Sequence, residues 1–265
     1  MKKIASLAVL AATSSVFAWD EYGALSAKKL EIDVMVNYAA GTGGYDEDGK
    51  KQDNEDGFSP ATTVPVLGLK YGIIDGLDVE LAVPFTMYNE DASPTGEALS
   101  GLDRVNLGLK YTHATGFGGF LAADLPFGSE DIVSPDPATT IYAAVQYTKT
   151  FGKVALNDFV LFKTTLEVEE SKPADVLWIY VKPQYNVTDK IGPYLGLDYQ
   201  MTVGKAKMGG EEYDAESSLL TVKPGINYIA TDAIGIEANV PVTVMGKTAG
   251  AGYGVYAGFY YTIGL

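Results

Sequence analysis

The chain has 265 residues, and its 34 Asp and Glu outweigh its 19 Lys and Arg to give a net charge of −15. This acidic balance argues against nucleic acid as a partner, because phosphate binding needs a basic patch. The sequence holds no cysteine, which excludes disulfides, thiolate metal sites and cysteine nucleophiles.

Residues 1–18, MKKIASLAVLAATSSVFA, have the pattern of an export signal. Lys2 and Lys3 precede an apolar run of about nine residues, which is too short to span a bilayer, and a small residue ends the segment. We therefore expect a cleaved signal peptide over 1–18 and one domain over 19–265. No later run of 18 apolar residues follows, so a helical membrane protein is excluded.

Residues 63–89, TVPVLGLKYGIIDGLDVELAVPFTMYN, form the unit from which the rest of the chain is built. Apolar residues alternate with polar or small ones on both sides of Asp75-Gly76, which is a tight-turn signal. This pattern predicts a hairpin of strands about 10 residues long, with one apolar face toward lipid and one polar face toward water.

The same pattern recurs along the chain and predicts twelve strands. Asn157 and Asp158 disturb the alternation of the seventh strand, where a β-bulge is one interpretation. The expected strands cover 28–38, 63–74, 77–89, 102–113, 120–127, 139–151, 153–166, 176–187, 191–203, 219–229, 234–245 and 253–265.

Five short turns alternate with six longer connections, the last of which is the Gly-rich segment GKTAGAG. Strict alternation predicts an all-β fold, a 12-stranded antiparallel up-and-down transmembrane β-barrel of the Gram-negative outer membrane, with both termini on the periplasmic side. The longer connections hold most of the acidic residues, so we expect these residues at the external mouth.

A soluble sandwich or lipocalin-like barrel is the alternative, and it would turn the apolar faces inward. Alternation alone does not separate the two. The long, uniform strands, the small residues on the polar faces and the tyrosines near strand ends favour the membrane barrel, since Tyr forms girdles at membrane interfaces.

Lysines and acids recur on the polar faces and suggest a ladder of ion pairs around the lumen. We expect Lys70 opposite Glu80, Lys110 opposite Asp124, Lys182 diagonal to Asp198, and Lys223 diagonal to Glu237. The pairs either brace the interior or form a charged constriction that selects solutes, and the narrow interior of twelve strands favours bracing. The candidate lumen-lining residues are Lys70, Glu80, Arg104, Lys110, Asp124, Lys182, Asp198, Lys223 and Glu237.

Nothing in the sequence points to a catalytic or metal site. His113, the single histidine, lies beside a short turn and is expected to be a solvated turn residue. The acids Asp46, Asp48, Asp53 and Asp56 could coordinate Ca²⁺, but their spacing fits no ligand loop, and a charged, solvated loop is the better interpretation. We expect no enzyme activity, no catalytic residues, no metal and no cofactor.

The segments LKYGIIDGLDVELAVPF and GLDRVNLGLKYTHATGFGGFLAADLPFG resemble the outer-membrane barrel family labelled for the meta-pathway of phenol degradation. The shared features are Tyr71-Gly72, Asp75, Gly101 to Asp103, and Leu107 to Tyr111. Here Arg104 follows the Gly-Leu-Asp segment, and a second Gly before Asp75 is missing, both of which depart from the family pattern. The resemblance implies an outer-membrane transport barrel of unspecified cargo.

These features lead us to expect a porin-like channel that passes small solutes passively across the outer membrane, in contact with membrane lipid. A closed structural or binding barrel that acts through its acidic external loops is the alternative. Which solute passes, and whether protomers associate, stay open at this stage.

Overall fold

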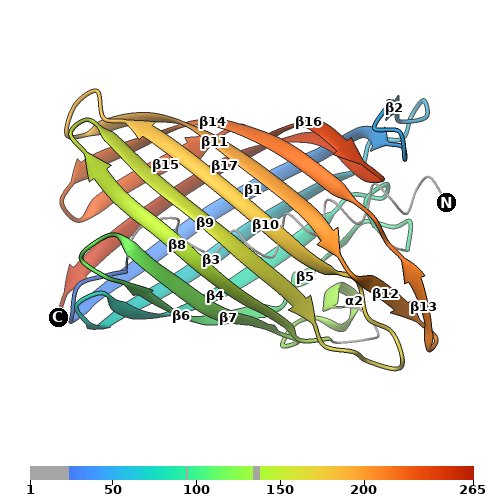
Figure 1. Ribbon diagram of the computed structural model, residues 1–265, viewed down its shortest axis with the longest axis horizontal. Coiled ribbons are helices and arrows are strands. Elements are labelled where there is room, and N and C mark those ends of the chain that lie inside the picture. Colours follow the sequence, from blue (N-terminus) through green and yellow to red (C-terminus); the bar gives the residue numbers. More distant parts are fainter. Residues whose placement is uncertain (1–23, 94, 134–137) are drawn as a thin grey trace.

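The computed structural model of the protein describes residues 24–93, 95–133 and 138–265, so the expected signal peptide lies outside the described residues. Within them, twelve spanning strands form one closed antiparallel barrel, in which the strands run obliquely to the long axis (Figure 1). The spanning strands are β1 (Lys29–Tyr45), β3 (Ala61–Ile74), β4 (Leu77–Tyr88), β6 (Val105–Thr112), β7 (Phe117–Leu125), β8 (Thr140–Phe151), β9 (Val154–Thr165), β10 (Asp175–Tyr185), β11 (Ile191–Val203), β14 (Ser218–Thr231), β15 (Ile234–Asn239) continued by β16 (Val242–Lys247), and β17 (Ala249–Gly264).

The first and last spanning strands pair with each other and close the barrel. The β1–β17 ladder runs from Lys29 opposite Gly264 to Tyr45 opposite Ala249, with one register shift near Gly41. Closure satisfies the backbone groups of strands that would otherwise be edges, which a bilayer requires because its core holds no water. The expected fold class is confirmed.

The two ends of the barrel differ in their connections. The five tight turns, the start of β1 and the end of β17 lie at one end, which we call the turn end (Figure 1). The long connections and the one-residue link at Thr248 lie at the other end, which we call the loop end. No helix of the described residues is long and apolar enough to cross a membrane. The small elements of the long connections are β2 (Lys51–Asp53), β5 (Leu99–Leu102), α2 (Glu130–Val133), β12 (Lys205–Met208) and β13 (Glu211–Asp214).

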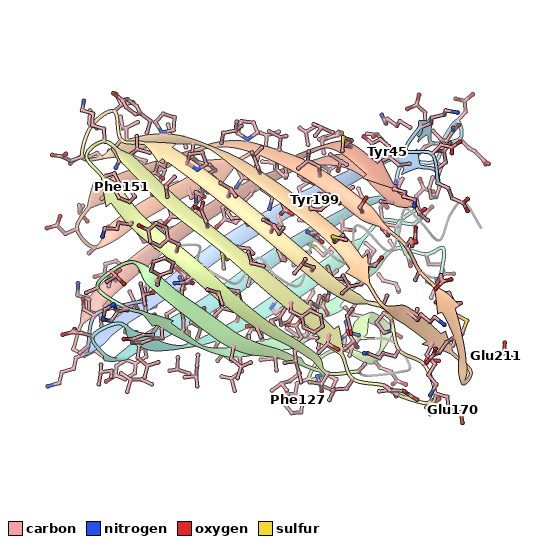
Figure 2. All side chains as sticks on the ribbon, viewed as in Figure 1. Tyr45, Phe127, Phe151, Glu170, Tyr199 and Glu211 are labelled. Carbon is pink, nitrogen blue, oxygen red and sulfur yellow. The ribbon has the colours of Figure 1, made fainter. Side chains whose placement is uncertain are left out.

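The apolar side of each alternating strand points away from the barrel axis. On β3, Leu67 and Leu69 are exposed whereas Val66 and Lys70 are buried, and the same division runs around the barrel. Figure 2 shows side chains that cover the outside of the barrel wall, with Phe151 at the turn end. This facing is opposite to that of a soluble barrel and matches a lipid-facing exterior.

Three local expectations are corrected. The ladders of β9 with both neighbours are continuous, so Asn157 and Asp158 form no bulge. The last connection is not long, because only Thr248 separates β16 from β17. The eleventh strand is interrupted at Val240 and Pro241, since proline has no N–H to donate to a ladder.

Two glycines are required by local geometry. Gly76 in the β3–β4 turn has a φ of 80°, which residues with a Cβ rarely adopt. On the inner face, a Cβ at Gly235 would come within 1.9 Å of the ring of Tyr260, so this tyrosine lies flat on the wall only because its neighbour is glycine.

We expect Leu67→Arg to lower the free energy of unfolding in lipid vesicles by about 2–4 kcal/mol, because Leu67 is 48% exposed at the middle of β3 and would place a charge in the lipid core. Leu67→Met is the matched control and should cost less than about 1.5 kcal/mol. Denaturant titration of vesicle-embedded protein measures both values. Equal stability of Leu67→Arg and wild type would contradict the outward facing.

Candidate functional site

The candidate site is the inner face of the barrel, where charged side chains gather. Eight of the nine candidate lumen residues are buried on the polar faces of their strands, and Arg104 is partly buried at the loop end. The buried eight are Lys70, Glu80, Lys110, Asp124, Lys182, Asp198, Lys223 and Glu237.

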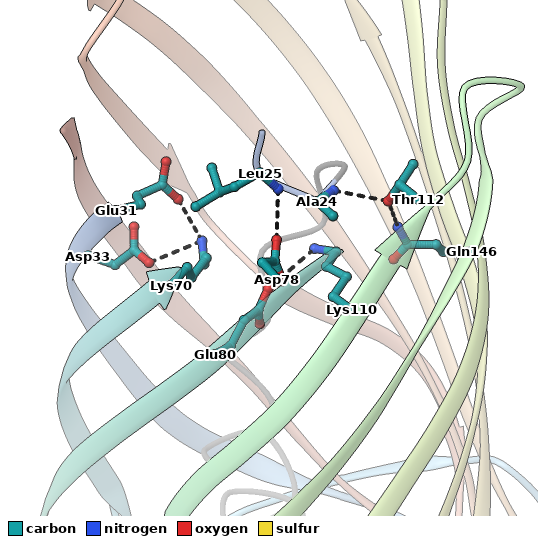
Figure 3. A network of polar contacts seen from close by, with 10 residues as sticks. All are labelled: Ala24, Leu25, Glu31, Asp33, Lys70, Asp78, Glu80, Lys110, Thr112 and Gln146. Carbon is teal, nitrogen blue, oxygen red and sulfur yellow. Dashed lines mark hydrogen bonds and ion pairs between the residues drawn. The ribbon is translucent and has the colours of Figure 1, made fainter. Parts of the chain in front are cut away.

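A first charged cluster lies inside β1, β3, β4 and β6 near the turn end (Figure 3). Lys70 Nζ lies 2.9 Å from Glu31 Oε1 and 3.0 Å from Asp33 Oδ2. Lys110 Nζ lies 3.9 Å from Glu80 Oε1. Lys70 is opposite Glu80 in the ladder, as expected, yet it forms ion pairs with the two acids of β1 on its other side.

The segment before β1 joins this cluster through its backbone. The amide of Leu25 donates to Asp78 Oδ2 at 2.8 Å, and the amide of Ala24 donates to Thr112 Oγ1 at 3.0 Å. Thr112 Oγ1 also accepts from Gln146 Nε2 (Figure 3). Residues 24 and 25 therefore run along the inner side of β4 and β6 at the turn end, a placement that alternation alone does not predict.

A second charged cluster lies inside β10, β11, β14 and β15. Lys182, whose side chain is 0% exposed, places Nζ 2.7 Å from Glu237 Oε1, and Lys223 Nζ lies 2.6 Å from Asp198 Oδ2. The hydroxyl of Tyr194 also donates to Glu237. Lys182 reaches past two intervening strands to its acid, because β11 and β14 lie between β10 and β15.

The two pairings expected for this cluster are therefore exchanged. Lys182 is diagonal to Asp198 in register, since Tyr180 is opposite Asp198, but it pairs with Glu237 instead. Lys223 is not diagonal to Glu237, because the residue opposite Glu237 is Asn227. A long lysine side chain is within reach of several acids, so strand register alone does not determine which acid it pairs with.

Asp124 lies away from Lys110, which corrects the third expected pair. The residue opposite Lys110 is Phe120, and the residue opposite Asp124 is Asn106, whose Nδ2 donates to Asp124 at 2.7 Å. The hydroxyl of Tyr142 donates to the second carboxylate oxygen. The error comes from the position of the turn between β6 and β7, because β7 begins at Phe117 and not at residue 120, so the residue opposite Lys110 becomes Phe120.

Arg104 and His113 lie outside the charged clusters. Arg104 precedes β6, and its Nη2 donates to the carbonyl of Val133 at 3.1 Å, so it fastens α2 to the loop end. His113 is exposed in the β6–β7 turn, where its Nδ1 lies 2.9 Å from Thr115 Oγ1.

The sequence reasoning missed a largely aromatic, apolar cluster on the inner face of β7 to β10. Its buried members include Phe120, Tyr142, Leu161 and Trp178, with Phe159 packed against them. The weak alternation of the seventh predicted strand could have indicated this cluster. Phe159 and Leu161 make the inner face of β9 apolar, in addition to its apolar outer face.

The loop end carries a strong negative charge. The five long connections together hold twenty Asp and Glu against six Lys and Arg, whereas the five short turns hold three acids and two bases. Glu170 and Glu211 mark this end in Figure 2. No group of three or more His, Asp and Glu among the described residues is placed to hold a metal ion.

Asp46 shows how one acid of the loop end is used. Its carboxylate accepts hydrogen bonds from the amides of Asp48, at 3.0 Å, and Lys50, at 2.8 Å, and from Gln52 Nε2. The bond from the Lys50 amide is the main reason that the pKa of Asp46 lies below its ordinary value of 3.8. Asp46 therefore closes the turn after β1.

Neither a protein-family model nor a curated protein matches the chain. The resemblance to the barrel family labelled for the meta-pathway of phenol degradation is thus not confirmed and stays a prediction.

Solved structures do match, at low identity. The chain is similar to an outer membrane channel from Pseudomonas putida F1, with a TM-score of 0.76 and 14% identity over 91% of this chain and 98% of that one. It is also similar to the beta domain of the Bordetella autotransporter BrkA, with a TM-score of 0.55 and 10% identity over 88% and 99%. The translocator domain of the autotransporter NalP from Neisseria meningitidis is similar too, with a TM-score of 0.51 and 8% identity over 88% of each chain. The shared fold is that of outer-membrane barrels.

We expect Lys182→Met to lower the free energy of unfolding by about 3–5 kcal/mol, because it leaves Glu237 buried without its cation. The double variant Lys182→Met/Glu237→Gln should lose less stability than the sum of the losses of the two single variants. Chemical unfolding of the folded barrels measures all three losses. Lys50→Met, at an exposed loop position, is the control and should stay within about 0.5 kcal/mol of wild type. Additive losses would show that the two side chains do not interact.

Asp46 predicts a local pH dependence. Since its pKa is lowered in the folded protein, the stabilisation of the turn is fully present above the ordinary value of 3.8 and is lost as the pH falls through the folded pKa. Hydrogen exchange at the Lys50 amide should therefore become less protected in acid, beyond the intrinsic effect of pH. In Asp46→Ala this protection should already be lost at neutral pH, whereas unchanged protection would contradict the role of Asp46.

Proposed function

We propose that residues 1–18 direct export and that residues 19–265 form a passive channel for small solutes in the bacterial outer membrane. The observation that carries the proposal is the closed barrel with an apolar exterior and charged side chains on its inner face. An apolar exterior suits lipid, and an inner face of lysines and carboxylates suits water and polar solutes. The fold shared with the Pseudomonas putida channel supports this assignment.

In this proposal the two charged clusters line the solute path. Each cluster sets lysine ammonium groups beside carboxylates, so the path offers binding partners to solutes of either sign. No bond-making role is needed from any residue, and the channel works without a cofactor. The candidate lumen residues act by positioning and by electrostatic interaction alone.

The loop end adds a preference among ions. Its excess of acids over bases attracts cations from outside and repels anions, because clustered charge of one sign raises the local concentration of the opposite ion. The effect is screened by salt over a Debye length, which falls from about 30 Å at 0.01 M to about 3 Å at 1 M. We therefore propose a channel with a salt-dependent preference for cations.

A second candidate function is a closed barrel that acts through its loops. The burial of the inner charges favours it, since Lys110 is 1% exposed and Lys182 fully buried. Paired charges that fill a lumen brace the wall and leave less room for solutes. A conductance measurement separates the two candidates.

We expect purified protein to form ion-conducting pores in planar bilayers. The reversal potential in a KCl gradient should show a preference for K⁺ at low salt that weakens toward 1 M, as screening predicts. Silent bilayers at high protein load would contradict the channel and favour the closed barrel.

Within the same experiment, Lys110→Ala should alter conductance and strengthen the preference for K⁺, because it removes a cation beside Glu80. Lys149→Ala, at an exposed position outside the lumen near the turn end, is the matched control and should leave both values unchanged. Identical currents for Lys110→Ala and wild type would exclude the first charged cluster from the path.

A further inference from the structure

Aromatic rings form a continuous patch on the inner wall, which we call the inner aromatic patch and define as Phe120, Tyr142, Phe159, Trp178 and Tyr180. Ring centroids of Phe159 lie 5.4 Å from Trp178, 5.2 Å from Tyr180 and 6.1 Å from Phe120. Phe159 is the partly exposed member at the centre of the patch. The charged clusters would suffice for a purely hydrated lumen, so this patch points to a solute with apolar surface.

Within the part of the chain that the structure describes, the indole N–H of Trp178 in this patch lacks a hydrogen-bond partner. The side chain of Trp178 is only 7% exposed on the inner face of β10, and its indole N–H meets no acceptor among the described residues. A buried donor without an acceptor costs free energy. A bound molecule that supplies the acceptor removes this cost and is therefore held more tightly. The patch thus favours an aromatic solute that also carries an acceptor oxygen.

Charges of both signs flank the patch. On one side Lys223 pairs with Asp198, and its Nζ lies 5.2 Å from the ring centroid of Tyr180 and 5.9 Å from that of Trp178. On the other side Lys163 lies over the ring of Tyr142 and is attracted to Asp124. A ring bound on Phe159 would therefore have an ammonium and a carboxylate close to either end.

We propose that the inner aromatic patch is a binding subsite for a small zwitterionic solute that carries an aromatic ring, the class to which aromatic amino acids belong. The ring packs on Phe159 and Trp178, the carboxylate accepts from the indole N–H and faces Lys223, and the ammonium faces Asp198. The subsite rests on the proposed channel function and names a solute for it.

The acidic loop end favours a zwitterionic solute over an anionic one. An aromatic anion would be repelled at the mouth, and a simple cation would leave the indole N–H without an acceptor. A zwitterion has no net charge to be repelled, yet it offers both an acceptor and a cation to the wall. Aromatic contacts of this kind change affinity by roughly two- to tenfold.

Liposome swelling with L-phenylalanine and L-cyclohexylalanine tests the subsite, because the two solutes share the zwitterion and differ in ring aromaticity. We expect wild-type protein to take up phenylalanine roughly two- to tenfold faster at low concentration. Phe159→Leu should remove the difference. Phe162→Leu, on the lipid-facing side of the same strand, is the matched control and should retain it.

Tryptophan fluorescence gives a readout that does not depend on transport. The sequence has two tryptophans, so Trp19→Phe leaves Trp178 as the single reporter. We expect phenylalanine to shift its emission in a saturable way, cyclohexylalanine to do so more weakly, and Phe159→Leu to abolish the difference.

The outcomes separate the subsite from the channel. Open pores with equal uptake of both solutes and no saturable fluorescence change would overturn the subsite and leave the channel standing. Silent bilayers with a saturable response to phenylalanine would overturn the channel and support the subsite within a binding barrel.

Discussion

The pairing of β1 with β17 is the constraint on which the rest of the structure depends. It turns a sheet with two unsatisfied edges into a cylinder whose wall can face hydrocarbon, where each unpaired backbone group is costly. Once the wall is closed, the period of two along every strand sends one set of side chains to lipid and the other to the interior. The facing of the apolar residues and the burial of the charges both follow from that division.

Closure also creates an electrostatic difficulty that the inner face resolves. Lysines and acids brought into a narrow interior lose hydration, so each is stable only beside opposite charge or, for a carboxylate, beside a hydrogen-bond donor. The structure meets this need with long side chains that lie along the wall and reach past neighbours, as Lys182 does to contact Glu237. Glycines such as Gly235 leave room for inner tyrosines to lie flat.

The period-two pattern predicted the strand number, the facing and eight of the buried charged residues, because each is a local consequence of alternation. It did not single out Glu31, Asp33 and Asp78, which are part of the first charged cluster. It did not predict the pairing of Lys182, which reaches past two strands to Glu237, or that of Lys223, whose acid lies diagonally on the adjacent strand β11. Nor did it predict the contact of Leu25 with Asp78. The inner aromatic patch escaped notice for a related reason: where Phe159 and Leu161 line the interior, both faces of β9 are apolar and the alternation disappears. The position of one turn caused the remaining error, since β7 begins at Phe117, earlier than expected, and Asp124 therefore lies opposite Asn106.

The unequal charge of the two ends makes the molecule an electrical dipole along its own axis. A dipolar pore does not respond equally to voltages of opposite sign, because ions collect at one mouth before they enter the narrow part. If the proposed channel conducts, a single inserted barrel rectifies the current, and the sense of that rectification reports which way round the barrel sits in the bilayer.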